Sequence, residues 1–252
     1  YDKGEAHCHP LNYALGIAQA ALSANAKIYE NSNVSSYDLS NSHVKVNTKS
    51  GSVKAERVVL ACNGYLGNLE KRLNSKILPM NNYIVATKPL DSETVAKINP
   101  RDIAFADSRF VINYFRLSAD KRLLFGGGEN YSQELSNNVI PIVTKPLEKI
   151  YPFLKGVKID YAWGGKLAIT MNRLPFYKEM NKGKVLSAQG YSGQGVALAS
   201  YAGKVIAEKI TGDGEIFDTM ANIPMQSFPG GGFLRNPTMK IGMFYHALLD
   251  RL

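Results

Sequence analysis

The stretch from Lys184 to Gly212, KVLSAQGYSGQGVALASYAGKVIAEKITG, constrains the fold more than any other part of the chain. Val185 to Ala188 is a short run that suits a buried strand, and a glycine-rich turn follows it directly. Gly212 occupies the position of a helix C-cap. Between the turn and Gly212, apolar residues recur at helical spacing, at Val196, Ala199, Ala202, Val205, Ile206 and Ile210. The stretch therefore predicts a strand, a turn and a helix in unbroken succession.

The turn predicts a place where a flat ligand approaches the backbone closely. Its glycines are Gly190, Gly193 and Gly195, and the free N–H groups of the following helix favour an anion by about 0.3–1 kcal/mol. The spacing G-x-x-G-x-G differs from the dinucleotide motif G-x-G-x-x-G and from the P-loop, which argues against a bound phosphate. The alternative is a tight strand-to-helix connection whose glycines only permit close packing.

The composition is that of an ordinary globular protein. A length of 252 residues, with 45% hydrophobic and 20% charged residues, suits one large domain or two smaller ones. No apolar window is long enough for a transmembrane helix, and the first ten residues resemble neither a signal peptide nor a transit peptide. The net charge of +9 arises from dispersed residues without a nucleic-acid-binding module. We therefore expect a solvated basic surface that attracts acidic substrates.

The cysteines and histidines favour a reduced, metal-free protein. Cys8 and Cys62 make no disulfide framework, which favours free thiols in a reducing compartment and a cytoplasmic location. The histidines show no metal-ligand spacing, and the one cluster, His7 and His9 beside Cys8, favours a structural or loop role.

The first part of the chain predicts a helix followed by a β-meander. Pro10 suits a first helical turn, and the apolar residues from Leu11 to Leu22 recur at helical spacing. The buried run Val58 to Ala61 ends at Asn63-Gly64, a position where ligands collect in open α/β sheets. Strands are expected over residues 26–29, 34–39, 43–48 and 52–62.

The middle of the chain predicts a separate antiparallel sheet. Residues 77–90 and 103–128 are rich in Tyr, Phe, Val and Ile, and Ser118 to Lys121 suits a hairpin turn. A helix kinked near Pro141 and Pro146 is expected over residues 138–154, and an extended segment over residues 157–171. The expected domains are residues 1–76 with 156–222, an inserted sheet domain of residues 77–155, and a C-terminal loop and helix, Met239 to Leu252, within residues 223–252.

Six segments carry a family resemblance along essentially the whole chain. They are HPLNYALGIAQAA, VVLACNGYLG, YFRLSADKRLLFGGG, IDYAWGGKLAITMNRLP, GYSGQGVALASYAGKVIAEKITG and the FPGG…LRNP tail. In this order they resemble the FAD-dependent amine and amino-acid oxidases of the D-amino-acid oxidase superfamily, and most of all its gamma-glutamylputrescine oxidoreductase branch.

The resemblance implies an α/β (α+β) flavoenzyme. It implies an incomplete Rossmann-type FAD-binding domain and a substrate domain whose antiparallel sheet covers the flavin ring. A helix N-terminus suits the negative charge that a reduced flavin carries at its N1 and C2-carbonyl edge. The implied FAD contacts are Val34 near the adenine, Ala61, Cys62 and Asn63 near the nucleotide, Gly164 and Gly165 near the flavin, and the turn residues Gly190, Tyr191, Ser192, Gly193, Gln194, Gly195 and Val196.

The chemistry implied by the resemblance is oxidation of an amine or amino acid. A hydride equivalent passes to flavin N5, water hydrolyses the resulting imine, and dioxygen or another electron acceptor reoxidises the flavin. Arg116 suits a bidentate pair with a substrate carboxylate. The alternative is that Tyr114 and Trp163 are core aromatics and that both arginines form surface or interdomain ion pairs. The implied substrate-side residues are Tyr114, Arg116, Trp163, Arg173 and Tyr191.

One departure from the family pattern concerns the cofactor. Relatives begin with a strand, a G-x-G-x-x-G turn, a helix and an acidic residue that binds ribose, and this sequence contains none of these. We therefore expect the polypeptide alone to bind FAD poorly or not at all and to self-associate, with a missing segment or a separate chain supplying the rest. The alternative function is a catalytically silent binding or interaction subunit that holds a small molecule or a partner chain.

Overall fold

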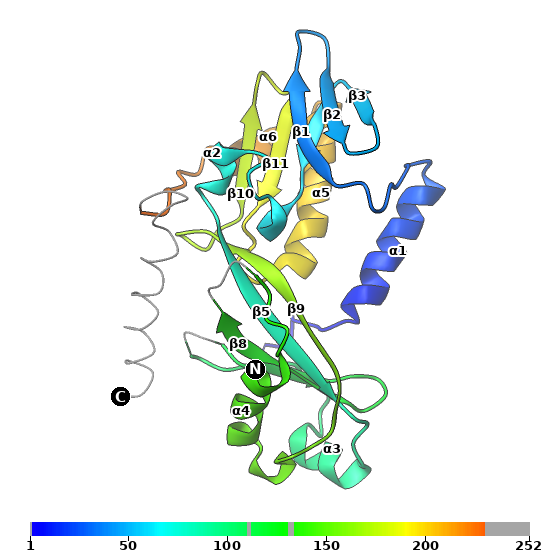
Figure 1. Cartoon of the computed structure of the whole chain (residues 1–252), viewed down its shortest axis with the longest axis vertical. Coiled ribbons are helices and arrows are strands. Elements are labelled where there is room, and N and C mark those ends of the chain that lie inside the picture. The colour runs from blue at the N-terminus through cyan, green and yellow to red at the C-terminus, as the bar shows by residue number, and fades with distance from the viewer. Residues whose placement is uncertain (1, 110–111, 131–133, 230–252) are drawn as a thin grey trace. The chain divides into compact units, whose positions relative to one another are not determined.

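The computed structural model of the chain describes residues 2–109, 112–130 and 134–229, which divide into two compact units (Figure 1). The antiparallel unit contains Met80–Lys166 and the first residues of the chain. The mixed-sheet unit contains Ile17–Pro79 and the described residues that follow Lys166. The C-terminal helix expected from Met239 lies outside the described residues, and the domain boundaries expected from the sequence stay a prediction.

The antiparallel unit is built on a five-stranded sheet of order β6-β7-β8-β5-β9. The predicted hairpin is confirmed, because the Ser118 N–H donates to the Arg122 carbonyl at 2.9 Å and joins β7 to β8. The strands are β5 (Leu78–Thr87), β6 (Phe105–Ala106), β7 (Tyr114–Leu117), β8 (Leu123–Asn130) and β9 (Ile159–Ile169). The helices are α3 (Ser92–Ile98), α4 (Ile140–Ile150) and the 3-10 turn Pro152–Leu154.

The core of the antiparallel unit lies between α4 and one face of this sheet. Val143 and Leu147 of α4 are fully buried in one cluster with Tyr83, Leu123 and Phe125 of the sheet. The ring of Phe125 stacks on Phe115, with centroids 5.3 Å apart. Because side chains alternate along a strand, the residues between these core positions point to the other face of the sheet.

The mixed-sheet unit contains two three-stranded sheets. One has the order β1-β2-β3, and the other has the order β10-β11-β4, in which β11 pairs antiparallel with β10 and parallel with β4. The strands are β1 (Val34–Leu39), β2 (Val44–Thr48), β3 (Ser52–Ala55), β4 (Val58–Leu60), β10 (Phe176–Met180) and β11 (Val185–Gln189). The helices are α2 (Lys71–Asn74), α5 (Gly195–Thr211), α6 (Glu215–Ala221) and the 3-10 turn Asn63–Tyr65.

Strand β11 is the centre of this unit, since all five of its residues are buried. On one face, Leu186 and Ala188 pack in a cluster with Ala202 and Val205 of α5. On the other face, Val185 packs in a second cluster with Leu60, Leu66, Leu73, Ile77, Ala168 and Phe176. The short run from Val185 to Ala188 that predicted a buried strand is therefore confirmed. So is the helix after it, which ends at Gly212 with a φ of 112°.

Other predictions are confirmed or corrected by the structure. Helix α1 (Pro10–Ser23) forms as predicted, and none of its residues is buried. The strand predicted over 26–29 is wrong: these residues are exposed and lie outside helices and strands, because four extended residues without a neighbouring strand make no sheet. The strand predicted over 52–62 is two strands, β3 and β4, which belong to different sheets. Helix α3 was not predicted, although its N-cap Asp91 accepts from the Thr94 N–H at 2.8 Å.

Candidate functional site

The glycine-rich turn between β11 and α5 is held by hydrogen bonds on two sides. The Gly190 N–H donates to Asn63 Oδ1 at 3.0 Å, and the Ser192 N–H donates to the Ala168 carbonyl at 2.9 Å. Gly190 has a φ of 75°, and a Cβ there would lie 2.5 Å from Thr170 Cγ2. Glycine is therefore required at this position both by the backbone and by the packing.

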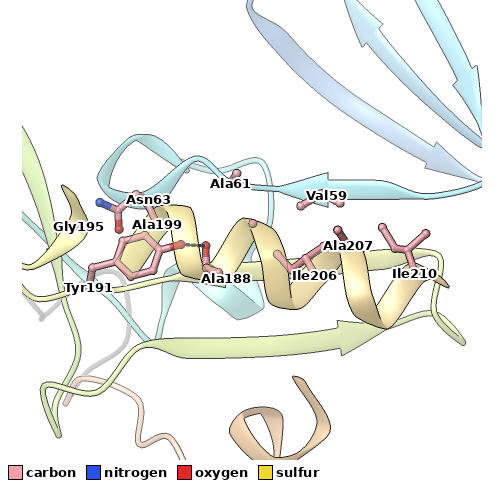
Figure 2. A pocket seen from close by; sticks show the side chains of 12 residues that line it. Val59, Ala61, Asn63, Ala188, Tyr191, Gly195, Ala199, Ile206, Ala207 and Ile210 are labelled. Atoms are coloured by element: carbon pink, nitrogen blue, oxygen red, sulfur yellow. Dashed lines mark hydrogen bonds between the residues drawn. The ribbon is translucent and has the colours of Figure 1, made fainter. Parts of the chain in front are cut away.

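The turn opens onto a cavity of about 480 Å³ between β4 and α5 (Figure 2). Four of the predicted cofactor residues line this cavity: Ala61, Asn63, Tyr191 and Gly195. Figure 2 shows Asn63, Tyr191 and Gly195 together at one end, and the apolar residues of β4 and α5 along the rest. The structure therefore joins the loop after β4 to the turn after β11, as the sequence predicts for a ligand at the carboxyl ends of parallel strands.

Tyr191 forms the wall of the cavity rather than a reactive group. Its ring is buried, and its hydroxyl donates to the Ala188 carbonyl at 3.0 Å (Figure 2). Burial raises the pKa of Tyr191 to about 12, with a smaller contribution from Tyr177. The phenol therefore stays neutral at ordinary pH, and its one proton is committed to the main chain.

The start of α5 offers main-chain donors beside this wall. The N-cap residue is Gln194, and no side chain caps the helix there in the described structure. The first N–H groups of α5 consequently have no partner within the helix. A Cβ at Gly193 would meet nothing within 4 Å, so the backbone of the turn is open to a ligand at this point.

These residues fit the group that the resemblance implies. An electron-rich edge such as the pyrimidine side of FAD matches a helix N-terminus that offers donors and a partial positive charge. Gln189, the last residue of β11, is fully buried, and its amide nitrogen and oxygen make no hydrogen bond among the described residues. Buried amides without partners are rare and point to an internal water or another bound group near the turn.

Five other predicted cofactor residues do not line the cavity: Val34, Cys62, Gly164, Gly165 and Val196. Val34 is the first residue of β1, where it pairs with Thr48. Cys62 packs against the cluster beneath β4, and burial raises the pKa of its thiol. In the antiparallel unit, a Cβ at Gly164 would lie 2.6 Å from the ring of Tyr83, so packing accounts for this glycine. Gly165 follows it in β9, and Val196 is exposed in the first turn of α5.

On the antiparallel sheet, the face opposite α4 carries Tyr114 and Arg116. The register pairs Tyr114 with Gly126 and Arg116 with Leu124, while Phe115 faces the core on the other side. The Tyr114 ring lies over Gly126, where a Cβ would come within 2.1 Å of the ring. The Tyr114 hydroxyl donates to Oδ1 of Asn82, a buried residue of β5. Gly126 and Asn82 therefore fix this ring on the open face of the sheet.

Arg116 is partly engaged by the main chain, and Trp163 is exposed. Two N–H groups of Arg116 donate to main-chain carbonyls, of Cys8 at 2.9 Å and of Leu117 at 3.1 Å. Part of its guanidinium is therefore engaged within the protein. Trp163 in β9 is 45% exposed and so is no core aromatic. Because Gly164 faces Tyr83, Trp163 points away from the core, to the face that carries Tyr114.

Arg173 belongs to the mixed-sheet unit, in a turn where its N–H donates to the Thr170 carbonyl at 3.3 Å. Its φ of 64° is unusual for a residue other than glycine. The structure thus brings Tyr114, Arg116 and Trp163 to one sheet face, while Arg173 and Tyr191 lie in the other unit.

The sequence analysis missed Asn82, Thr170 and Gln189. Asn82 holds the Tyr114 hydroxyl, Thr170 packs against Gly190, and Gln189 carries the buried amide. A weak signal existed for two of them, since Asn82 and Gln189 are polar residues within or at the end of strands that are mostly apolar. The sequence around Thr170 did not indicate its role, because that role is packing against Gly190, 20 positions away.

The described residues contain neither a helix able to cross a membrane nor a group of three potential metal ligands. Cys8 and Cys62 are free thiols, as expected.

Residues 1–209 match the model of the family described as FAD dependent oxidoreductase (DAO). The chain is 38% identical over 250 residues to "Probable oxidoreductase OrdL" of Rhizobium meliloti, covering 99% of this chain and 58% of that protein. It is 38% identical over 252 residues to gamma-glutamylputrescine oxidoreductase of Escherichia coli, covering 100% of this chain and 59% of that protein. The chain thus spans less than two thirds of the length of the curated relatives it matches.

Solved structures share the fold. Glycine oxidase from Bacillus cereus superposes with a TM-score of 0.67 at 20% identity, covering 83% of this chain and 58% of that one. L-Proline dehydrogenase from P. horikoshii superposes with a TM-score of 0.66 at 23% identity, covering 85% of this chain and 57% of that one. The family match along residues 1–209 shows that the chain belongs to the DAO family of FAD-dependent oxidoreductases.

Proposed function

We propose that this chain is part of an enzyme that oxidises an amine or an amino acid with FAD. The single observation that carries the proposal is the turn between β11 and α5, where Asn63, Tyr191 and Gly195 line one cavity beside uncapped helix donors. The 38% identity to gamma-glutamylputrescine oxidoreductase supports an amine as the substrate class. When bound, FAD supplies the two-electron acceptor for the carbon–nitrogen bond.

The residues of the mixed-sheet unit would hold the cofactor. The first N–H groups of α5 would donate to its electron-rich edge, while Asn63 keeps Gly190 in place. The neutral Tyr191 would close the cavity without adding charge. Val34, Ala61, Cys62, Gly164 and Gly165 stay proposed contacts.

The residues of the antiparallel unit would bind the substrate. Tyr114 presents a fixed ring and Trp163 an exposed one on the same sheet face. Arg116 would pair with a substrate carboxylate through the guanidinium N–H groups that do not donate to Cys8 or Leu117. Arg173 stays a proposed substrate residue. The polar ring-bearing face suits a small amine or amino acid, and dioxygen or another acceptor would reoxidise the cofactor.

The two free cysteines favour a reducing compartment, so we infer a cytoplasmic enzyme.

Anaerobic reduction of the flavin tests the proposed reaction. The sample is this chain combined with the part of the Escherichia coli relative that lies outside the match, loaded with FAD. Bleaching of the visible flavin bands by gamma-glutamylputrescine, sarcosine or a D-amino acid is the expected result, and the bleaching rates rank the substrates. Bound flavin that stays oxidised with every amine would instead favour the alternative function, a catalytically silent binding subunit.

A further inference from the structure

The antiparallel unit contains a second cavity, which the proposed function does not use. It has a volume of about 390 Å³ and lies between the last turns of α4 and β6, the end strand of the sheet. Phe105 and Phe115 line this α4 cavity, and Phe115 packs on the core cluster beneath α4. The α4 cavity therefore lies on the sheet face opposite the one that carries Tyr114 and Arg116. Small-ligand sites occupy about 300–1,000 Å³, so this volume suits a molecule of one or two rings.

Three phenylalanine rings form a ladder that ends at the α4 cavity. Phe125 stacks on Phe115 with ring centroids 5.3 Å apart, and Phe115 stacks on Phe105 with ring centroids 5.1 Å apart. Phe125 is fully buried, whereas Phe105 is partly exposed and belongs to the end strand. Aromatic rings favour stacked or edge contacts with one another. A planar ring bound in the α4 cavity would therefore extend the ladder beyond its last member.

The charged residues of the α4 cavity give it a net positive charge. Arg109 and Lys149 line it together with one acidic residue, Asp107. The Asp107 carboxylate is already engaged, because it accepts from the Asn113 N–H at 3.0 Å and from Asn113 Nδ2 at 2.6 Å. Arg109 Nε lies 3.9 Å from the same carboxylate, which is a long ion pair. Both cationic side chains are exposed and keep N–H donors for an anion.

The wall that carries Arg109 is fixed before any ligand binds. Asn113 is 4% exposed, and its carbonyl accepts from the Asp107 N–H at 3.0 Å. The Arg109 N–H donates to the Asp107 carboxylate at 3.3 Å. On the opposite wall, Lys149 belongs to the last turn of α4. A site whose walls are held in place loses less conformational entropy when a ligand binds.

We propose that the α4 cavity binds a small aromatic carboxylate. The ring of the ligand lies against Phe105 and Phe115, and its carboxylate meets Arg109 and Lys149. Two cations and one carboxylate leave one positive charge, which balances a single negative charge better than it balances a phosphate dianion. The proposal assigns a second small-molecule site to the antiparallel unit and goes beyond the oxidation chemistry proposed above.

Calorimetric titration of the whole chain with indoleacetate tests this site. Indoleacetamide has the same ring and shape without the charge, and cyclohexaneacetate has the charge without an aromatic ring. Lys149→Gln and Arg109→Gln each remove one cation from the α4 cavity. Lys145→Gln is the matched control, because it removes an exposed cation of the same helix that does not line the cavity. Arg116→Gln removes the cation of the opposite sheet face. Thermal melts verify that each variant is folded.

We expect indoleacetate to bind with a dissociation constant of about 1 mM or below, as suits a ligand of its size. Lys149→Gln and Arg109→Gln should each weaken binding about threefold and together about tenfold, while Lys145→Gln and Arg116→Gln should stay within about twofold of the unaltered chain. Indoleacetamide and cyclohexaneacetate should each bind about fivefold more weakly than indoleacetate.

Three results would overturn the proposal. The first is no heat of binding with indoleacetate at about 5 mM, well above the expected dissociation constant. The second is unchanged binding by the folded double variant of Arg109 and Lys149, and a loss confined to Arg116→Gln would place the ligand on the opposite sheet face. The third is equal binding of indoleacetate and indoleacetamide, which would remove the role of the two cations. None of these readouts uses flavin, so the failure of either proposal is recognised separately.

Discussion

The two main sheets of the molecule differ in how fully their strands are covered. In the antiparallel unit, α4 covers one sheet face and buries Tyr83, Leu123 and Phe125 completely. In the mixed-sheet unit, β11 is buried on both faces, yet its parallel neighbour β4, an edge strand among the described residues, leaves Val59 39% exposed. Both sheets combine hairpins with strands distant in sequence: β5 lies between β8 and β9 in the first, and β4 pairs in parallel with β11 in the second.

This difference distinguishes core residues, which stabilise the fold, from exposed apolar residues, which are available for association. Antiparallel strands can be joined by short turns, as β7 and β8 are, while a parallel pair such as β4 and β11 needs a crossover connection. Val59 of β4 and Ile210 of α5, each 39% exposed, line one groove, which is the cavity between β4 and α5. We therefore expect substitutions in the first region to change stability, and those in the groove to change association.

The largest effect is expected at the covered core. Phe125→Ala removes a ring that is fully buried and stacked on Phe115, and it should lower the free energy of unfolding by about 3–5 kcal/mol. Phe153→Ala removes the same ring from a residue that is 56% exposed, and its cost should stay below about 1 kcal/mol. Urea titrations of both variants measure the difference, and equal costs would contradict the assignment of the core.

A smaller effect is expected where the two loops of the candidate site meet. Asn63→Ala removes the acceptor of the Gly190 N–H and places alanine at a φ of 46°, which together should cost about 1–3 kcal/mol. Asn63→Asp keeps an acceptor and should retain most of this stability, while Asn63→Gly isolates the contribution of the backbone. Stability of Asn63→Ala equal to that of the unaltered chain would show that the two loops are not coupled.

The buried phenol of Tyr191 makes the mixed-sheet unit sensitive to alkali. Its pKa is raised by burial to about 12 from an ordinary value near 10. Because a raised pKa means that the folded state holds the proton more tightly, this stabilisation is complete below about pH 10 and is lost as the pH rises towards 12. Tyr191→Phe should flatten the fall in unfolding free energy over that range. An unchanged pH profile in Tyr191→Phe would locate the titrating group elsewhere.

The smallest change in stability is expected at the edge strand β4. Val59→Thr preserves the β-branched shape, and because Val59 is half-exposed it should alter the free energy of unfolding by no more than about 0.5 kcal/mol. Self-association of the chain should nevertheless fall severalfold, since the substitution makes the groove more polar. Sedimentation of the unaltered chain and of Val59→Thr over a range of concentrations measures their self-association. Identical self-association of the two proteins would show that the groove is not the surface through which the chain associates.

The sequence predicts the elements whose pattern is local. The apolar run of β11, the helical spacing of α5 and the hairpin after Leu117 each follow from a few neighbouring residues, and all three are confirmed. The strand predicted over 26–29 failed because pairing decides whether an extended segment joins a sheet. Within the candidate site, the glycine-rich turn was recognisable, but the buried amide of Gln189 and the support of Tyr114 by Asn82 depend on distant neighbours.

Retention of FAD tests the central claim most directly. The chain is mixed with FAD, passed through gel filtration and examined for visible flavin absorbance, first alone and then bound to a fragment that contains the rest of the Escherichia coli relative. We predict a colourless chain alone and a yellow complex, because the turn before α5 supplies only one edge of the cofactor site. Stoichiometric flavin retained by the chain alone, or a complex that forms without any flavin, would contradict the account.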